Sequence, residues 1–241
     1  ESDLEIIKRD WQIIIDKIKA GKAETLSEGD TMYLAACTKG ANKKSTRQQP
    51  FSDVPAMQRA YSLKSSYKTA SVRANLDSEK VISFASPEQL RKYSLEGLLE
   101  EKFKPYIGKT LTDLKEELEF ESKANNKSDV PSVVSRILGI KGTKLDDIEE
   151  FMKANIQFKT IRLEPDGYPK EHMSFEQINF QAWLDNDFED SQFYETFETT
   201  KFLFVVFEYK ETAKENPARN LYLRGIKLWN MPEETIQTYV K

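Results

Sequence analysis

Cysteine and histidine are scarce in this chain of 241 residues, which has one cysteine, Cys37, and one histidine, His172. A disulfide framework, a zinc cluster and a Cys/His catalytic pair cannot be assembled from these two residues alone. No run approaches the ~20 apolar residues of a membrane-spanning helix, and the opening Glu1-Ser2-Asp3 is neither a start methionine nor the charged beginning of a signal peptide. We therefore expect a piece of a cytoplasmic protein that has no membrane partner.

Charge is divided unevenly along the chain. The net charge of -4 argues weakly against a polyanionic partner. Residues 38–74, however, hold eight Lys or Arg against one Asp, a balance of +7, whereas residues 145–200 hold fourteen acids against four cations, a balance of -10. Such a division indicates one face that attracts phosphates. Charge alone leaves open the alternative that this face is only a solvated basic surface.

Hydrophobic spacing predicts the elements of the first third of the chain. Helical spacing over residues 4–18 predicts a helix with one buried side. Residues 31–37 are typical of a short buried strand, and residues 38–42 have the chemistry of a loop. Residues 61–74 predict a second helix that shows cations on its outer side. Periodicity is lost over residues 75–87, where we place a linker between domains.

The rest of the sequence predicts an α+β fold with a mixed sheet. Thr110 or Thr112 is the expected N-cap of one of its helices. A turn at residues 164–167 follows the first predicted strand. The predicted helices cover residues 87–103, 110–120 and 130–138 with a terminal helix from Pro232, and the predicted strands cover residues 156–163, 173–180, 202–207 and 220–229.

Two places match part of the pattern of a metal-dependent nuclease. That pattern is an acid, a gap and then acid-x-lysine, because a divalent metal needs oxygen ligands and the attacking water needs a nearby cation. Asp113 with the triplet at residues 121–123, ESK, fits the order, but the triplet ends a predicted helix where such charges are usually solvated. Glu150 with Gln157 and Lys159 has a suitable spacing in a strand, but Gln157 is neutral. Lys159 is then either a phosphate contact or one outward lysine of a strand.

The stretch EGDTMYLAACTKGAN at residues 28–42, continued by RAYSLK at residues 59–64, resembles a known nuclease family. It is similar to the DNA-contacting half of two-domain, GATC-cleaving type II restriction endonucleases, which are relatives of the mismatch-repair nicking enzyme MutH. The resemblance extends over nearly the whole chain, and CTKGAN at residues 37–42 is its most specific part. It implies a restriction-endonuclease-like (MutH-like) mixed sheet flanked by helices.

The resemblance also implies a division into domains. Residues 1–76 resemble the C-terminal, DNA-contacting half of a first MutH-like domain, whose nuclease half would precede them. Residues 77–90 would be the linker, and residues 91–241 the N-terminal part of a second MutH-like domain, with residues 108–114 resembling its opening helix.

The second domain departs from the family at its catalytic positions. Ser135 stands where the family has a glutamate, and Glu150, Gln157 and Lys159 stand where it has aspartate and glutamate-x-lysine. The resemblance therefore implies a degenerate copy that binds DNA or regulates the first domain without cleaving. Mg²⁺ is expected for the parent enzyme and is not expected to bind this chain.

Double-stranded DNA is the expected partner, and self-association is left open. By resemblance, Thr38, Lys39, Gly40 and Asn42 would lie near the bases or phosphates of the site. Ser62 stands where MutH has a tyrosine linked to methylation sensing, so methylation behaviour is not transferred. The full set of expected DNA-binding residues is Thr38, Lys39, Gly40, Asn42, Lys43, Lys44, Arg47, Arg59, Ser62, Lys64 and Lys68. A non-catalytic allosteric module and a MutH-type mismatch-repair nicking protein are the alternative functions.

Overall fold

The computed structural model describes residues 2–39, 45–76, 81–119, 129–140, 145–175, 177, 181, 184 and 188–238. Its helices are α1 (Ser2–Lys19), α2 (Ser65–Leu76), α3 (Pro87–Lys92), α4 (Leu95–Phe103), α5 (Leu111–Glu117), α6 (Asp129–Ile137), α7 (Glu149–Ala154), α9 (Gln192–Thr199) and α10 (Glu233–Thr238). Its strands are β1 (Leu34–Thr38), β2 (Thr46–Gln49), β3 (Ser52–Met57), β4 (Arg59–Leu63), β5 (Ile156–Leu163), β6 (Lys201–Tyr209) and β7 (Leu221–Trp229). None of the described helices is long and apolar enough to span a membrane.

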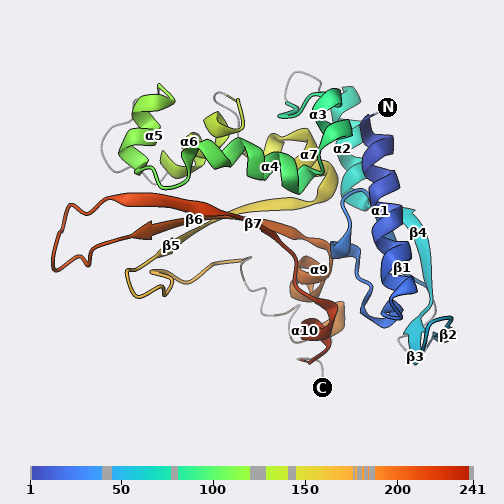
Figure 1. Cartoon of the computed structure of the whole chain (residues 1–241). Coiled ribbons are helices and arrows are strands. Elements are labelled where there is room, and N and C mark those ends of the chain that lie inside the picture. The colour runs from blue at the N-terminus through green and yellow to red at the C-terminus, as the bar shows by residue number, and fades with distance from the viewer. Residues whose placement is uncertain are drawn as a thin grey trace.

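A mixed three-stranded sheet forms the centre of the molecule (Figure 1). Strand β6 pairs with β5 in parallel and with β7 in antiparallel orientation. The parallel pair needs a crossover, and helix α9 lies within the connection between β5 and β6. This arrangement confirms the predicted α+β fold with a mixed sheet.

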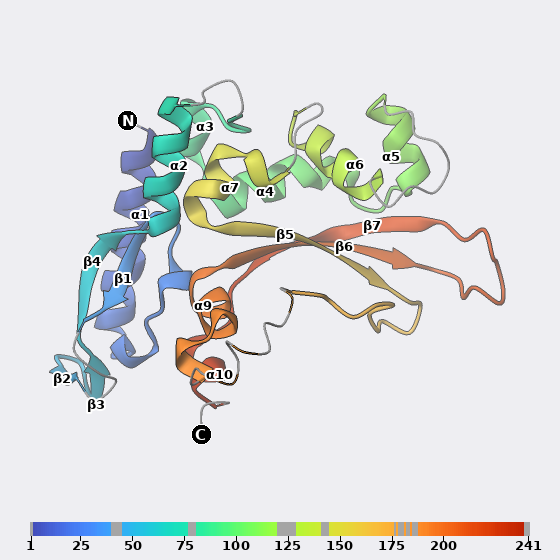
Figure 2. The same ribbon diagram turned by 180° about the vertical axis from the view of Figure 1, so that it is seen from behind.

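The two faces of the sheet are covered by different helices. Helices α4 to α7 lie over one face, and α9 and α10 lie against the other near one end (Figures 1 and 2). Side chains of a strand point alternately to opposite faces. Leu203 and Val205 of β6 accordingly join the main core with Leu99 of α4, whereas Phe202 and Phe204 pack with α9 and α10.

The N-terminal segment is fixed to the sheet domain by a shared hydrophobic core and by side-chain ion pairs. Ile6 of α1 and Tyr33 belong to the same buried cluster as the helices that cover the sheet. Lys153 of α7 is buried and its Nζ lies 2.7 Å from a carboxylate oxygen of Asp3 and 2.7 Å from one of Glu149. Helices α1 and α2, together with the paired strands β1 and β4, therefore have a defined position at one end of the sheet.

The buried carboxylate of Asp10 fixes the start of strand β1. Asp10 is 1% exposed, and its two oxygens accept hydrogen bonds from the backbone N–H groups of Met32, Tyr33 and Leu34 at 2.8, 2.6 and 2.9 Å. These N–H groups stand just before and at the beginning of β1, where no strand partner satisfies them all. Helix α1 thus sets the position from which the strand runs toward Thr38.

Several predicted elements agree with the structure. Helix α1 fits the expected residues 4–18, and strands β5, β6 and β7 fit the strands expected at residues 156–163, 202–207 and 220–229. Thr110 is the N-cap of α5, since its hydroxyl accepts from the backbone N–H of Asp113 at 3.0 Å. The long helix expected over residues 87–103 is divided into α3 and α4, because Ser94 caps a new helix start.

Other predictions were wrong or incomplete. The helix expected over residues 61–74 begins at Ser65, because residues 59–63 form β4 and pair with β1. Strands β2 and β3 were not foreseen. The return strand expected over residues 173–180 is absent over its described residues, 173–175 and 177. In the described residues, a bridge between Leu163 and Pro169 and the backbone hydrogen bond from Lys170 to Arg162 join the two sides of the turn.

Three of the described residues of the expected linker are packed in the main core. Phe84, Ala85 and Leu90 are 6%, 8% and 4% exposed and belong to the main core. The division into a first domain half at residues 1–76 and a second domain at residues 91–241 stays a prediction, since a shared core does not reveal the origin of its parts.

Candidate nucleic-acid interface

The end of strand β1 presents the first predicted DNA contacts. Thr38 is paired with Arg59 of β4, and the backbone N–H of Lys39 donates to the carbonyl of Gln58 at 2.7 Å. Both Thr38 and Lys39 are exposed. Strand pairing therefore fixes the backbone of Lys39 while its ammonium is accessible. Four further predicted contacts, Gly40, Asn42, Lys43 and Lys44, lie outside the described residues.

The two predicted arginines of this region differ in what their guanidinium groups do. Arg59 is half-buried, and its Nη1 donates to the carbonyl of Ala36 at 2.7 Å across the β1–β4 pair. Part of its hydrogen-bonding capacity is thus used inside the protein. Arg47 lies on β2, where it pairs with Ala56 and is exposed. Of the two arginines, Arg47 is the better candidate for a phosphate contact.

Lys64 does not fit its predicted role as a DNA contact. It is 3% exposed, and its Nζ donates to the carbonyl of Thr31 at 2.8 Å. Burial, together with repulsion from Lys201, lowers the pKa of Lys64 to about 7. Burial disfavours the charged form of a lysine. The Lys64 side chain therefore has a structural role, packed between the N-terminal elements and the sheet.

The remaining predicted contacts of this region are Ser62 and Lys68. The hydroxyl of Ser62 is half-buried and donates to the carbonyl of Leu63 at 3.2 Å. Lys68 is exposed on α2, where a long side chain reaches a phosphate but seldom a base edge. The exposed members of the predicted set in the described residues are therefore Thr38, Lys39, Arg47 and Lys68.

The β2–β3 hairpin is anchored to the end of helix α1. A side chain at Gly21 would place its Cβ 2.5 Å from the carbonyl oxygen of Phe51, and the φ of +69° at Gly21 also favours glycine. The buried amide of Gln49 accepts from the backbone N–H of Ala23 at 3.1 Å. The hairpin thus has a fixed direction, and Arg47 has a fixed place on it.

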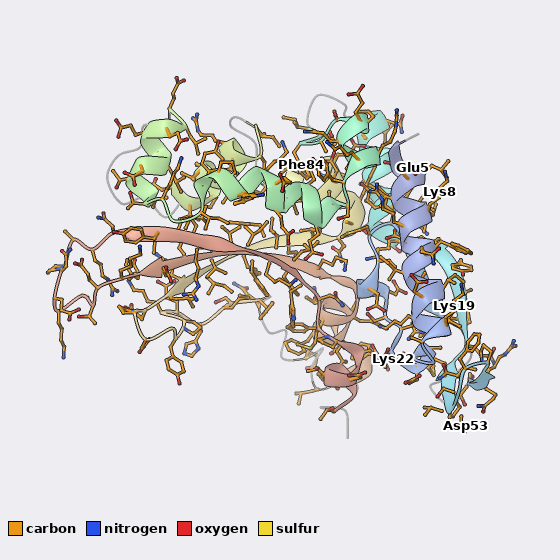
Figure 3. The ribbon with its side chains drawn as sticks, in the orientation of Figure 1. Glu5, Lys8, Lys19, Lys22, Asp53 and Phe84 are labelled. Atoms are coloured by element: carbon orange, nitrogen blue, oxygen red, sulfur yellow. The ribbon has the colours of Figure 1, made fainter. Side chains whose placement is uncertain are left out.

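This anchoring adds cations that the sequence analysis did not single out. Lys19 and Lys22 are exposed at the end of α1, near the hairpin that carries Asp53 (Figure 3). They lie outside the basic run of residues 38–74, so only the fold brings them to the same end of the molecule as Arg47. Their one advance signal was the helix predicted over residues 4–18, which they closely follow.

The degenerate catalytic position Glu150 is used for structure. It is 3% exposed, one carboxylate oxygen accepts from the hydroxyl of Ser83, and the other accepts from the backbone N–H of Phe84 at 3.3 Å. Burial raises the pKa of Glu150. The ring of Phe84, labelled in Figure 3, packs edge-on against Phe151 with centroids 5.6 Å apart. Glu150 therefore holds the segment before α3 in the core.

The other degenerate positions are separated from the Glu150 carboxylate. Gln157 and Lys159 line a groove beside β5, whereas Glu150 lines a different cavity. The Nζ of Lys159 donates to the carbonyl of Ser174 at 2.9 Å. Ser135 is buried in α6 and carries no carboxylate. The four positions do not form one catalytic cluster.

These residues do not fit a catalytic Mg²⁺ ion. Mg²⁺ needs oxygen ligands in octahedral geometry, usually including one or two carboxylates. Glu150 directs both carboxylate oxygens to Ser83 and Phe84, and Gln157 and Ser135 carry no charge. Among the described residues, no group of three or more His, Cys, Asp or Glu is placed to hold a metal ion.

Comparison with known proteins gives two matches. The family model described as the DNA mismatch repair enzyme MutH matches residues 142–239, which include Glu150, Gln157 and Lys159. The chain is also 40% identical, over 252 aligned residues, to the type II restriction enzyme Sau3AI of Staphylococcus aureus. That alignment covers 99% of this chain and 50% of the enzyme, so the chain spans about half the length of this curated relative.

Proposed function

Because the chain belongs to the MutH-like family, which includes restriction endonucleases, we propose that it is the DNA-binding part of a type II site-specific deoxyribonuclease acting at GATC. In this proposal the chain binds double-stranded DNA and does not cleave it. The longer enzyme would use Mg²⁺ and carboxylates outside these 241 residues.

The main support for binding without cleavage is the state of Glu150. A nuclease of this family pattern needs its carboxylates free to face a metal ion and the scissile phosphate. Glu150 is instead buried against Ser83 and Phe84, and it lines a different cavity from Gln157 and Lys159. Phosphate contacts need only positive charge and donors, which exposed Lys39, Arg47 and Lys68 supply.

Two lysines of this surface are expected to play different roles. Lys39 follows a strand directly and has Gly40 beside it, and glycine allows close approach of a ligand to the backbone. Lys68 is exposed on a helix face. A phosphate contact carries no sequence information, whereas a good base contact discriminates by ~1–3 kcal/mol.

We expect Lys39→Ala in the intact longer enzyme to lower its preference for GATC over a one-base variant by ~1–3 kcal/mol. Lys68→Ala should weaken binding to both duplexes alike. The measurement is the affinity of each variant for the two duplexes at one salt concentration. Equal losses on the two duplexes for Lys39→Ala would remove this lysine from the recognition site.

A further inference from the structure

The turn that joins strands β2 and β3 carries an exposed aromatic ring. Gln49 pairs with Ser52, so Pro50 and Phe51 alone connect the two strands, and we call these two residues the hairpin tip. Turns of this length favour Asn-Gly, Asp-Gly and other pairs that contain glycine. Pro50 and Phe51 are both exposed, and Phe51 is 61% exposed. Turn chemistry therefore does not explain the ring at this place.

The backbone of the hairpin tip is held in place although the Phe51 ring is exposed. The Nε2 of Gln49 donates to the carbonyl of Val54 at 2.7 Å and to a carboxylate oxygen of Glu24 at 2.7 Å. The carbonyl of Phe51 lies so close to Gly21 that no side chain fits there. One exposed apolar side chain is ordinary on a protein surface. A ring on a fixed backbone, however, loses little conformational entropy when it enters a partner.

Exposed cations lie around the hairpin tip. Lys22 directly follows Gly21, and Lys19 ends helix α1, at the same end of the molecule as the hairpin (Figure 3). Arg47 is exposed on β2. Asp53 is exposed as well and is the one acid of the hairpin sequence at residues 46–57. Three cations against this acid give the surface around the ring an attraction for phosphates.

We propose that the Phe51 ring inserts between neighbouring base pairs of duplex DNA and kinks the duplex, an inference that rests on the function proposed above. Proteins that bend DNA frequently place an apolar wedge such as Phe or Pro between two base steps. The lost stacking is offset by the further contacts that the bend permits. Here Lys22 and Arg47, on the two elements that meet at the tip, supply such contacts to phosphates.

The hairpin also predicts where the kink lies relative to Lys39. Lys39 is bonded through its backbone N–H to the carbonyl of Gln58, and the N–H of Gln58 donates to the carbonyl of Ser45, at the base of the hairpin. Strand β2 has four residues between this base and the tip, a length of about 13 Å. Base pairs are stacked about 3.4 Å apart. The kink is therefore expected within about four steps of the base that Lys39 contacts.

The test of the bend is energy transfer between dyes at the two ends of a GATC-containing duplex, with the full 241-residue chain in EDTA. The unmodified chain should bring the ends closer, by a kink of roughly 20–90°. Phe51→Ala should leave bound DNA straight, whereas Phe51→Leu keeps an apolar wedge and should retain most of the bend. Leu4→Ala is the matched control, because Leu4 is 53% exposed at the opposite end of α1, and it should bend DNA like the unmodified chain.

The salt dependence of affinity separates the wedge from the phosphate contacts. Phe51→Ala should weaken binding about tenfold, near the effect of one base stacked on an aromatic ring. This loss should be the same at every salt concentration, because the ring carries no charge. Arg47→Ala should instead make the log-log slope of affinity against salt shallower by about 1. At low salt, DNA bound to Arg47→Ala should still be bent.

The place of the kink is measured with 2-aminopurine, a base whose fluorescence rises when it is unstacked. It replaces one base at a time in duplexes that cover GATC and the four base pairs on each side. One position should brighten with the unmodified chain and with Phe51→Leu but not with Phe51→Ala. Thermal unfolding verifies that each variant is folded. If Phe51→Ala does not fold, Phe51→Asn, which has a common turn residue, takes its place.

Failure of this proposal can be told apart from failure of the proposed function. If the unmodified chain binds duplex without bending it, or if Phe51→Ala bends it equally well, the tip is not a wedge, although the chain still binds DNA. Weaker binding by Phe51→Ala with an unchanged bend would make the tip a surface contact and would also overturn the proposal. If the unmodified chain does not bind duplex at all, both proposals are wrong.

Discussion

Plasmid DNA that contains GATC sites is expected to remain uncut when the pure 241-residue chain is added with Mg²⁺ or with Mn²⁺. Cleavage by a metal-dependent nuclease needs carboxylates that hold the metal against the scissile phosphate. Here Ser135 and Gln157 offer no charge, and Glu150 is turned into the core against Ser83. The rate of plasmid cleavage should equal that of a sample without protein, which means that the chain gives no catalysis at all.

Gln157→Glu is the sharpest companion to this assay. It restores the glutamate-x-lysine pair with Lys159, yet we expect no cleavage from it, because the carboxylate of Glu150 still lines a different cavity. Specific fragments from the pure unmodified chain, lost on Lys159→Ala, would show that residues 135–159 form a working site after all.

Asp10→Ala is expected to lower the free energy of unfolding by about 3–5 kcal/mol, because three N–H groups near the start of β1 lose their acceptor and an unsatisfied buried donor costs about 1–3 kcal/mol. The Asp10 carboxylate accepts from Met32, Tyr33 and Leu34 and is 1% exposed. The measurement is equilibrium unfolding in urea.

Asp16→Ala provides the matched control on the same helix. Asp16 is exposed and accepts from the side chain of Gln12 at 2.7 Å, so its loss should change stability by no more than about 0.5 kcal/mol. A loss below about 1 kcal/mol for Asp10→Ala would mean that the start of β1 does not depend on helix α1. The presentation of Lys39 would then have to rest on the strand pair alone.

The sequence predicted elements whose pattern is decided locally. The apolar spacing of residues 4–18 and the β-branched and aromatic runs that became β6 and β7 are sufficient by themselves. Residues 61–63 were different, because Tyr61 and Leu63 fit either a helix face or a strand. Pairing with β1 decides for the strand, and that pairing joins residues that are 21 to 29 positions apart along the chain.

The candidate site shows the same limit. Residue types and spacing were sufficient to identify Gln157 as the wrong side chain for a metal ligand. They could not reveal that Glu150 faces Ser83, since this contact spans 67 residues. Nor could they reveal that Lys64 is buried and donates to the carbonyl of Thr31. The groove that Gln157 and Lys159 line likewise depends on the packing of α2 beside β5, which no local pattern encodes.

The central claim is that this chain binds duplex DNA through exposed cations and does so without cleaving it. The most direct test is the affinity of the unmodified chain for a GATC-containing duplex, measured in EDTA as a function of salt concentration. Neutralising about four to six phosphates predicts a log-log slope of roughly -4 to -5. A slope near zero, or no binding at low salt, would contradict the claim and would point to a protein or a small molecule as the partner.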